Sequence, residues 1–506
     1  MKSGELYSGT RFRRALRAFM FGRMAQGIAH FVLTLWVIRL LGLSDYGAYM
    51  ALWGLVEIMS PLSSLGLLEA TRRFMPDLAT RGSADGVRSF VKWTTLARFA
   101  ILFAWAGAIA LGWPVLTAWL GFSPMQIEQA WIGVALVVSV LGFRYAAETL
   151  ETLLEQRWSQ LAHALLPIGR LLGVVLLVSM GAVSLATLLW VDLIVSVFCL
   201  LLAEWALVRR LRTLDTVGEY RVSVREVLGF AWHMAGVNIL SAVASVGALR
   251  LLAARLLGLE AMGLYAFLQQ LTTIVSRYMP AQLLANIIRP MLIARRAAGE
   301  AAVVGQGVGL MWKSNLLIVL AGLAILAVAG DSIIRWVSGG RFEQAGLVML
   351  VLFLGLGANS QGLLINMAMQ IHDRTRELRT QSLLFLFVPV AAWAGGQLGL
   401  AGFVAGIVLA QWLRNGVALW WMRRYGIDIV LDVPGLARAM VVTVLAVAPV
   451  WFFEDQLGVW LALLFTVLSV GAAFLLARPL SRADESIAER ILKGKARFLR
   501  PFVYAG

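Results

Sequence analysis

The fold is decided by the stretch Arg39-Leu40-Leu41-Gly42-Leu43-Ser44-Asp45-Tyr46-Gly47-Ala48-Tyr49, because a close copy of it follows 216 residues later. The copy reads Arg255-Leu256-Leu257-Gly258-Leu259-Glu260-Ala261-Met262-Gly263-Leu264-Tyr265, and seven of the eleven positions are identical. Each copy joins one long apolar run to the next. The chain is therefore predicted to contain two structurally equivalent halves.

The composition predicts that the lipid bilayer is the solvent of these halves. Of the 506 residues, 60% are hydrophobic and 14% are charged, whereas a soluble domain carries about 25% charged residues. A membrane-spanning helix needs about 20 mostly apolar residues. About fourteen stretches qualify: 19–42, 46–71, 93–120, 129–148, 161–180, 184–208, 227–254, 262–288, 303–329, 344–370, 381–400, 402–421, 439–453 and 458–477. We predict an all-α polytopic membrane protein with about 14 transmembrane helices.

The basic residues predict the orientation. With the N-terminus in the cytoplasm, 32 of the 44 Lys and Arg residues fall on the cytoplasmic side, ten lie in or beside spans, and Arg335 and Arg341 alone lie opposite. Cytoplasmic loops of membrane proteins carry this excess, so both termini are predicted to be cytoplasmic. The basic stretch 1–18 has no small-residue cleavage site and is interpreted as a retained signal anchor.

The two copies are separated by six predicted spans, an even number, so the halves are parallel rather than inverted repeats. The predicted organisation is an N-terminal six-helix lobe at 1–208, a cytoplasmic linker at 209–226 and a C-terminal six-helix lobe at 227–421. Residues 422–506 add two further C-terminal helices and a basic cytoplasmic tail.

Several function classes are disfavoured by the sequence. One cysteine permits neither an internal disulfide nor a Cys-ligated metal site, and no Gly-x-x-x-x-Gly-Lys-Ser/Thr loop for ATP occurs. The net charge of +16 follows the membrane topology, so we predict no nucleic-acid partner. A glycosyltransferase or polymerase is disfavoured because the longest periplasmic loop, 330–343, has only Asp331 and Glu343 as acids. We expect no enzyme activity, cofactor or metal.

Charged residues inside spans are the candidate functional residues, because they are costly in lipid and line cavities or ion pathways. Arg170, Arg277 and Lys313 lie deep in their spans and are predicted to line a water-filled, cationic cavity. Bases outnumber acids at this depth, which favours an anionic ligand such as a phosphate. The remaining candidates allow two interpretations each. Arg23, Arg98 and Arg144 either line the cavity or snorkel to the membrane surface. Glu57 and Asp192 either couple an ion or form salt bridges, and His30 either relays protons or is a packed, structural residue.

Two further features bear on movement. Pro61 and Pro280 lie in spans 2 and 8, where they predict bends that would suit rocking between outward and inward states; alternatively, the prolines are simply tolerated. Gly42 and Gly47 suit a tight turn with close backbone approach, and Tyr49 is expected at the headgroup level.

The stretch Leu40–Tyr49, with Leu62-Ser63-Ser64-Leu65-Gly66-Leu67-Leu68-Glu69-Ala70-Thr71-Arg72-Arg73-Phe74 after it, resembles the opening of the Wzx-type polysaccharide-export flippases. These belong to the multidrug/oligosaccharidyl-lipid/polysaccharide exporter (MOP) superfamily. The second copy, followed by Ile288-Arg289-Pro290, is similar to the start of that family's second half.

The resemblance implies alternating access by two six-helix lobes in a bacterial inner membrane. It implies a cargo of polyprenyl-pyrophosphate-linked oligosaccharide, carried from the cytoplasmic to the periplasmic leaflet for polysaccharide biosynthesis. The expected partners are that cargo, membrane lipids, and polymerase or export machinery. Arg23 stands where such flippases tend to carry a basic group. The drug-exporting relatives tend to have an acidic coupling residue on span 1 or 2. Here span 1 has none and Glu57 is the only deep acid on span 2, which weakens the alternative of a cation-coupled multidrug exporter.

Overall fold

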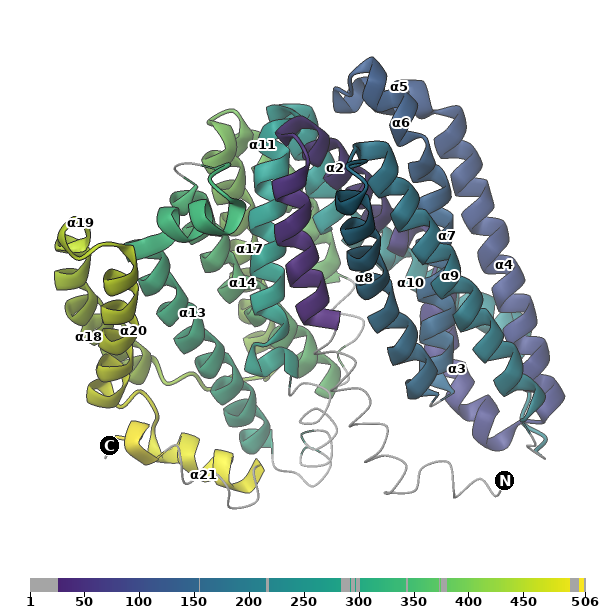
Figure 1. Cartoon of the computed structure of the whole chain (residues 1–506). Helices are drawn as coiled ribbons and strands as arrows, with labels where there is room; N and C mark the ends of the chain where they lie inside the picture. The colour runs from purple at the N-terminus through teal and green to yellow at the C-terminus, as the bar shows by residue number, and fades with distance from the viewer. Residues whose placement is uncertain are drawn as a thin grey trace. The chain divides into compact units, whose positions relative to one another are not determined.

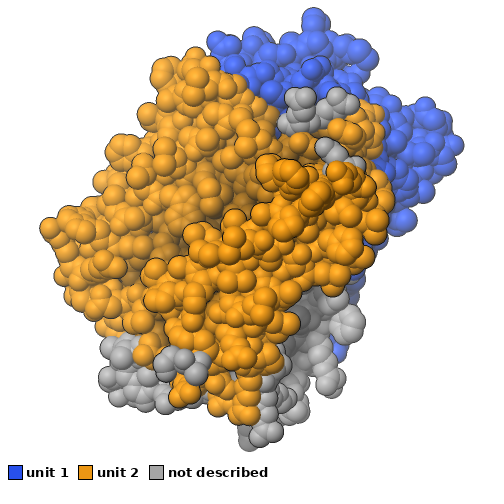
Figure 2. Space-filling model, turned by 90° about the vertical axis from the view of Figure 1, so that its left-hand side faces the viewer, with its two compact units in different colours: residues 1–267 blue, residues 268–506 orange. Residues whose placement is uncertain are grey.

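The computed structural model describes residues 26–153, 155–214, 218–283, 292, 296, 301–342, 345–372, 374, 380–491 and 500–504. It is 87% helical, and the described residues contain no β-strand. By their internal contacts, residues 1–267 and 268–506 form two compact units, here called unit 1 and unit 2 (Figure 2). The lobes predicted at 1–208 and 227–421 follow the repeat rather than these contacts, and they stay a prediction.

The first described helix of unit 1 is Gln26–Leu40. The helices that follow (Figure 1) are α2 (Leu43–Ser64), α3 (Leu67–Arg81), α4 (Ala84–Leu111), α5 (Trp113–Leu120), α6 (Pro124–Ala130), α7 (Ile132–Thr152), α8 (Gln156–Ser179), α9 (Leu185–Arg212), α10 (Val224–Val243) and α11 (Val246–Arg277), the last of which continues into unit 2. The helices α3, α4, α7, α8, α9 and α10 share a core that includes Phe74, Phe90, Phe143 and Leu207.

Unit 2 contains α13 (Ala301–Ser338), α14 (Gly346–Ile371), the 3₁₀ turn η2 (Leu383–Leu386), α16 (Phe387–Gly396), α17 (Gly399–Arg424), α18 (Val433–Phe452), α19 (Glu454–Leu457), α20 (Val459–Ala477) and α21 (Arg482–Ile491). One core joins α13, α14 and α17. A smaller core joins α13 to the pair α18 and α20, which lie side by side (Figure 1).

The chain is a multi-pass membrane protein. Ten described helices are long and apolar enough to cross a membrane, and eleven if the bent pair α2 and α3 is one span. Their outward faces are apolar: Leu111 of α4 and Leu476 of α20 are 89% and 76% exposed, as suits helices surrounded by lipid. The difference from fourteen arises at three places: two further apolar helices are described only over Gln26–Leu40 and Thr380–Gly396, and Val224–Arg277 forms one stretch of 54 residues.

The predicted bends occur near both prolines. The chain bends by 55° between α2 and α3, where Leu65 and Gly66 have positive φ values of 42° and 78°, four residues after Pro61. In the second half, α11 ends at Arg277, directly before a break that precedes Pro280. Both breaks therefore lie within a few residues of a proline, and the equivalence of the two halves stays a prediction.

The two copies of the repeat pack against each other within unit 1. A Cβ added to Gly47 would come closer than 3.0 Å to the Leu259 carbonyl oxygen, and one added to Gly247 would do so at Gly54. The expected close backbone approach thus falls at Gly47 and not at Gly42, which has open space around it. Gly258 is required for a different reason, since its φ of 84° lies in the region that favours glycine.

Candidate functional site

The polar interior of unit 1 is organised by one face of α2. Tyr49, Trp53 and Glu57 are spaced four residues apart, so their side chains project from the same side of the helix. The Tyr49 hydroxyl donates a hydrogen bond to Asp192 Oδ2 over 2.8 Å, and Trp53 Nε1 donates to the same oxygen over 3.2 Å. Tyr49 is therefore the buried partner of an acid, and its depth at the headgroup level stays a prediction.

Arg170 on α8 completes this group. Its Nε lies 3.1 Å from Asp192 Oδ1, and the two side chains are 7% and 5% exposed. The Arg170 guanidinium lies over the Trp53 ring, 4.1 Å from Cζ to the ring centroid, a favourable cation–π geometry. Its Nη2 is buried without a hydrogen-bond partner among the described residues. Arg170 thus keeps a donor that a ligand oxygen could use.

Small residues place Arg170 there. Gly169 and Gly173 flank it on α8, and their α-carbons lie against Val195 and Val191 of α9. Side chains at either position would push the helices apart, since a Cβ on Gly169 would lie 2.8 Å from Val195. The close approach brings Arg170 within reach of Asp192, which lies on the same helix as the two valines.

A second ion pair lies two turns along α2 from Tyr49. Arg144 Nη2 on α7 donates to Glu57 Oε1 over 2.7 Å, and the side chains are 32% and 37% exposed. Glu57 also acts electrostatically on the buried Arg250 of α11, so its carboxylate interacts with both halves of the repeat. We call Tyr49, Trp53, Glu57, Arg144, Arg170 and Asp192 the α2 cluster.

Arg98 lies apart from the ion pairs of this cluster. It is 3% exposed on α4, with Cζ 5.8 Å from the Tyr145 ring centroid. Its Nε and Nη1 are buried without hydrogen-bond partners among the described residues. Glu69 and Glu148 act on it electrostatically. Arg98 is therefore buried rather than extended to the surface.

The other predicted site residues have separate locations. Arg23 and the Ile288-Arg289-Pro290 stretch lie outside the described residues. His30 is half-buried in the helix Gln26–Leu40, and Arg277 is half-buried at the end of α11. Lys313, in unit 2, is fully buried and bound by two carboxylates, Asp432 and Asp484.

The structure thus joins Arg170 to Asp192 and Arg144 to Glu57, in the salt bridges considered from the sequence. The predicted surplus of positive charge is smaller than the sequence suggested, because the acids that bind Lys313 lie outside the predicted spans. Tyr49 and Trp53 were not predicted as site residues. Their spacing of eight and four residues from Glu57, which places all three on one face of a helix, was the available signal.

No three His, Cys, Asp or Glu side chains gather into a possible metal site within the described part of the chain. The α2 cluster offers arginine donors for an anion and carboxylates for a cation or a proton. In the structure these groups form ion pairs with each other.

Comparisons with known proteins concern the fold. No family model matches the chain, and no curated protein matches it. Among solved structures, the lipid II flippase MurJ in an inward closed conformation has a TM-score of 0.67 at 11% identity, covering 94% of this chain and 99% of its own.

An inward-facing multidrug resistance MATE family transporter of the MOP superfamily has a TM-score of 0.61 at 15% identity, covering 79% of this chain and 94% of its own. A mutant of the Vibrio cholerae MATE transporter VcmN has a TM-score of 0.55 at 12% identity, covering 84% of this chain and 97% of its own. At these identities the likeness concerns the fold alone: this chain has the fold shared by MATE transporters of the MOP superfamily and the lipid II flippase MurJ.

Proposed function

We propose that this protein is a flippase that moves a polyprenyl-(pyro)phosphate-linked oligosaccharide from the cytoplasmic to the periplasmic leaflet by alternating access. The motif resemblance to Wzx-type flippases supports the cargo class. The fold supports a transporter, and one protein with this fold is described as a flippase of lipid II. The sequence has no ATP-binding loop, so an ion gradient, the membrane potential or the cargo gradient would drive transport.

The observation that carries the proposal is the Arg170 guanidinium. A buried arginine whose Nη2 has no hydrogen-bond partner among the described residues is suited to a phosphoryl oxygen, since arginine keeps its charge at any depth and its planar fork matches phosphate. Trp53 would hold the guanidinium in place from one side. Asp192 would act as a resident counter-charge that a more highly charged pyrophosphate displaces in part.

Arg144, Arg98, Arg277 and Arg23 remain proposed contacts along the cargo path. Lys313 is left out, because both of its carboxylate partners already occupy its ammonium group. Glu57 and Asp192 would reset the arginines after release of the cargo. His30 remains a proposed proton relay.

The test is polymer export in cells that lack the chromosomal copy. Arg170→Ala combined with Asp192→Asn removes the guanidinium without leaving a buried unpaired acid, and we expect export to be abolished while the protein stays in the membrane. Arg277→Ala is the second arm, with the same expectation. Arg39→Ala is the matched control, since Arg39 is exposed at a helix end. Full export by both test variants would refute the assignment.

Glu57 favours a second candidate, a cation-coupled multidrug exporter. Its carboxylate lies on the second predicted span, where the drug-exporting relatives tend to carry an acid, and its side chain is 37% exposed. Under this alternative Glu57→Gln loses drug resistance. Under the flippase proposal, drug susceptibility is unchanged and lipid-linked oligosaccharide accumulates in the inner leaflet when the protein is absent.

We also propose that the protein lies in the bacterial inner membrane with both termini in the cytoplasm, where it would meet polymerase or export machinery. Alkaline phosphatase fused after Gly339 should then be active, and the same enzyme fused after Arg424 should be inactive. The reverse pattern would refute this orientation.

A further inference from the structure

One face of α13 receives an extended segment of the chain. Gly305, Gly309 and Lys313 are spaced four residues apart and project from the same side of the helix. The segment 428–432 runs along this face: Val430 N donates to the Gly305 carbonyl over 3.3 Å, and a Cβ on Gly309 would strike the Val430 backbone. Because the two glycines have no side chains, the backbone of segment 428–432 can lie directly against α13.

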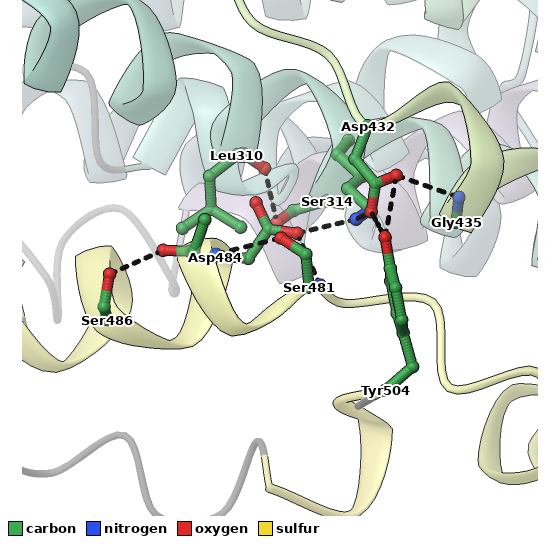
Figure 3. A network of polar contacts seen from close by, with 10 residues as sticks. Leu310, Ser314, Asp432, Gly435, Ser481, Asp484, Ser486 and Tyr504 are labelled. Atoms are coloured by element: carbon green, nitrogen blue, oxygen red, sulfur yellow. Dashed lines mark hydrogen bonds and ion pairs between the residues drawn. The ribbon is translucent and has the colours of Figure 1, made fainter. Parts of the chain in front are cut away.

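Lys313 lies about one turn after Gly309, on the same face of α13. Its side chain is 1% exposed, and Nζ lies 2.5 Å from Asp432 Oδ2 and 2.6 Å from Asp484 Oδ2. Asp432 precedes the first turn of α18, and Asp484 belongs to α21. The carboxylates are close together although they come from separate segments (Figure 3). One buried ammonium thus joins three parts of unit 2.

Further bonds hold these carboxylates. The Tyr504 hydroxyl donates to both oxygens of Asp432 at 3.2 Å, and Gly435 N donates to its Oδ1 at 3.0 Å (Figure 3). Ser481 N donates to Asp484 Oδ2 at 2.9 Å. Every one of these donors stabilises a charged acid.

The chain near residue 504 is itself fixed. Tyr504 N donates to the Leu480 carbonyl over 2.8 Å, and Leu480 N donates to Phe502 O over 2.9 Å. The Arg438 guanidinium lies over the Tyr504 ring, with Cζ 3.8 Å from the centroid. Residues 480 and 502–504 therefore pair beside α18 and bring the tyrosine to Asp432.

The electrostatics keep Asp432 ionised. Burial alone raises its pKa, but the hydrogen bonds from Lys313 and Gly435, the Lys313 charge and the Tyr504 hydroxyl outweigh burial, and the pKa of Asp432 is lowered. Burial and the Asp432 charge raise the pKa of Tyr504, which keeps its hydroxyl proton available for donation.

We infer that Lys313, Asp432, Asp484 and Tyr504 form a clasp that fastens the extra helices α18 and α20 and the tail to α13. Lys313 is then a positioning residue and not a contact of the cargo. Because parting a buried ion pair leaves uncompensated charges, the clasp stays closed during transport, and residues 428–491 and 500–504 move with α13 as one body. The inference adds to the proposed function and does not depend on which cargo is carried.

The test is limited trypsin digestion of the purified full-length protein, with mass spectrometry of the peptide released after Arg482, which lies in the first turn of α21. Lys313→Met leaves two buried carboxylates facing each other, so we expect release to accelerate at least about tenfold. The triple variant Lys313→Met, Asp432→Asn, Asp484→Asn removes all three charges and keeps a good helix-capping residue at 432. It should restore most of the protection, and also polymer export in cells.

The control is Glu485→Gln, which removes an exposed partner of Arg500 and should leave the release rate unchanged, because exposed ion pairs contribute little. Unchanged release in Lys313→Met would refute the clasp. A triple variant that regains protection but exports nothing would refute the positioning role and return Lys313 to the cargo path. Digestion needs no cargo, so failure of the proposed function would leave the protection results unaffected.

Discussion

Gly47→Ala tests the contact between the two copies of the repeat. The new Cβ would come well inside 3.0 Å of the Leu259 carbonyl oxygen, whereas non-bonded heavy atoms pack at roughly 3.5 Å. The backbones of α2 and α11 would therefore have to separate by about 1 Å. Overpacking of this kind costs about 1–3 kcal/mol, and the better helix propensity of alanine returns up to about 1 kcal/mol. A net loss of about 1–2 kcal/mol is expected.

The measurement is the melting temperature of the detergent-solubilised protein, compared across a graded set of glycines. Gly263 is the counterpart of Gly47, and a Cβ there would lie 3.3 Å from Tyr46, so Gly263→Ala should cost less. Gly107 lies inside α4 with no atom within 4 Å of an added Cβ, so Gly107→Ala should melt at or above the wild-type temperature. Equal melting temperatures for Gly47→Ala and Gly107→Ala would refute the reasoning.

Three further predictions concern charges. Asp192→Asn leaves the buried Arg170 without its counter-charge, which costs about 3–5 kcal/mol. The melting temperature should therefore fall, and it should recover when Arg170→Met is added. No recovery would argue against the ion pair as the cause. Glu57→Gln should cost only about 1 kcal/mol or less, because Glu57 and Arg144 are 37% and 32% exposed; a loss of folded protein would contradict this. The clasp should weaken only in acid. The pKa of Asp432 is lowered on folding, so its contribution is present above about pH 4, the unfolded value, and is lost as the pH falls through the lowered pKa. Lys313, Asp484, Tyr504 and Arg438 are the charged or titratable groups around it. Hydrogen exchange of residues 480–491 should therefore be flat from pH 8 to pH 5, after correction for intrinsic rates, and rise below about pH 4; a rise near neutral pH would refute this.

Much of the fold could be predicted from hydropathy, because the bilayer forces each apolar stretch into a helix. Every predicted span overlaps a described helix. The break at Ala244–Ser245 inside the predicted span 227–254 could not be foreseen, since both residues are compatible with a helix. Composition also gave no warning that α10 and most of α11 belong to unit 1. That assignment depends on the contacts of α10 with α2 and α3.

The candidate site was predicted only in part. Depth within a span identified Arg170 and Asp192 as residues that need partners, and their pairing follows from the cost of isolated charges in lipid. Depth alone could not predict the partners of Lys313. Asp432 and Asp484 lie outside the predicted spans, and the tertiary fold brings their carboxylates to the lysine. The role of Tyr49 was missed because a tyrosine near a span end usually marks the interface, and only the approach of α9 turns it into a partner of Asp192.

The α2 cluster has no charged counterpart in the second copy. The residues 216 positions after Trp53 and Glu57 are Gln269 and Thr273, which hydrogen-bond to each other, Gln269 Nε2 donating to Thr273 Oγ1 over 3.0 Å. We therefore predict that the two copies cannot substitute for one another. A homodimer of the first half would contain two copies of Glu57, and a homodimer of the second half would contain none. Separately expressed halves should therefore restore function only when the first half is combined with the second.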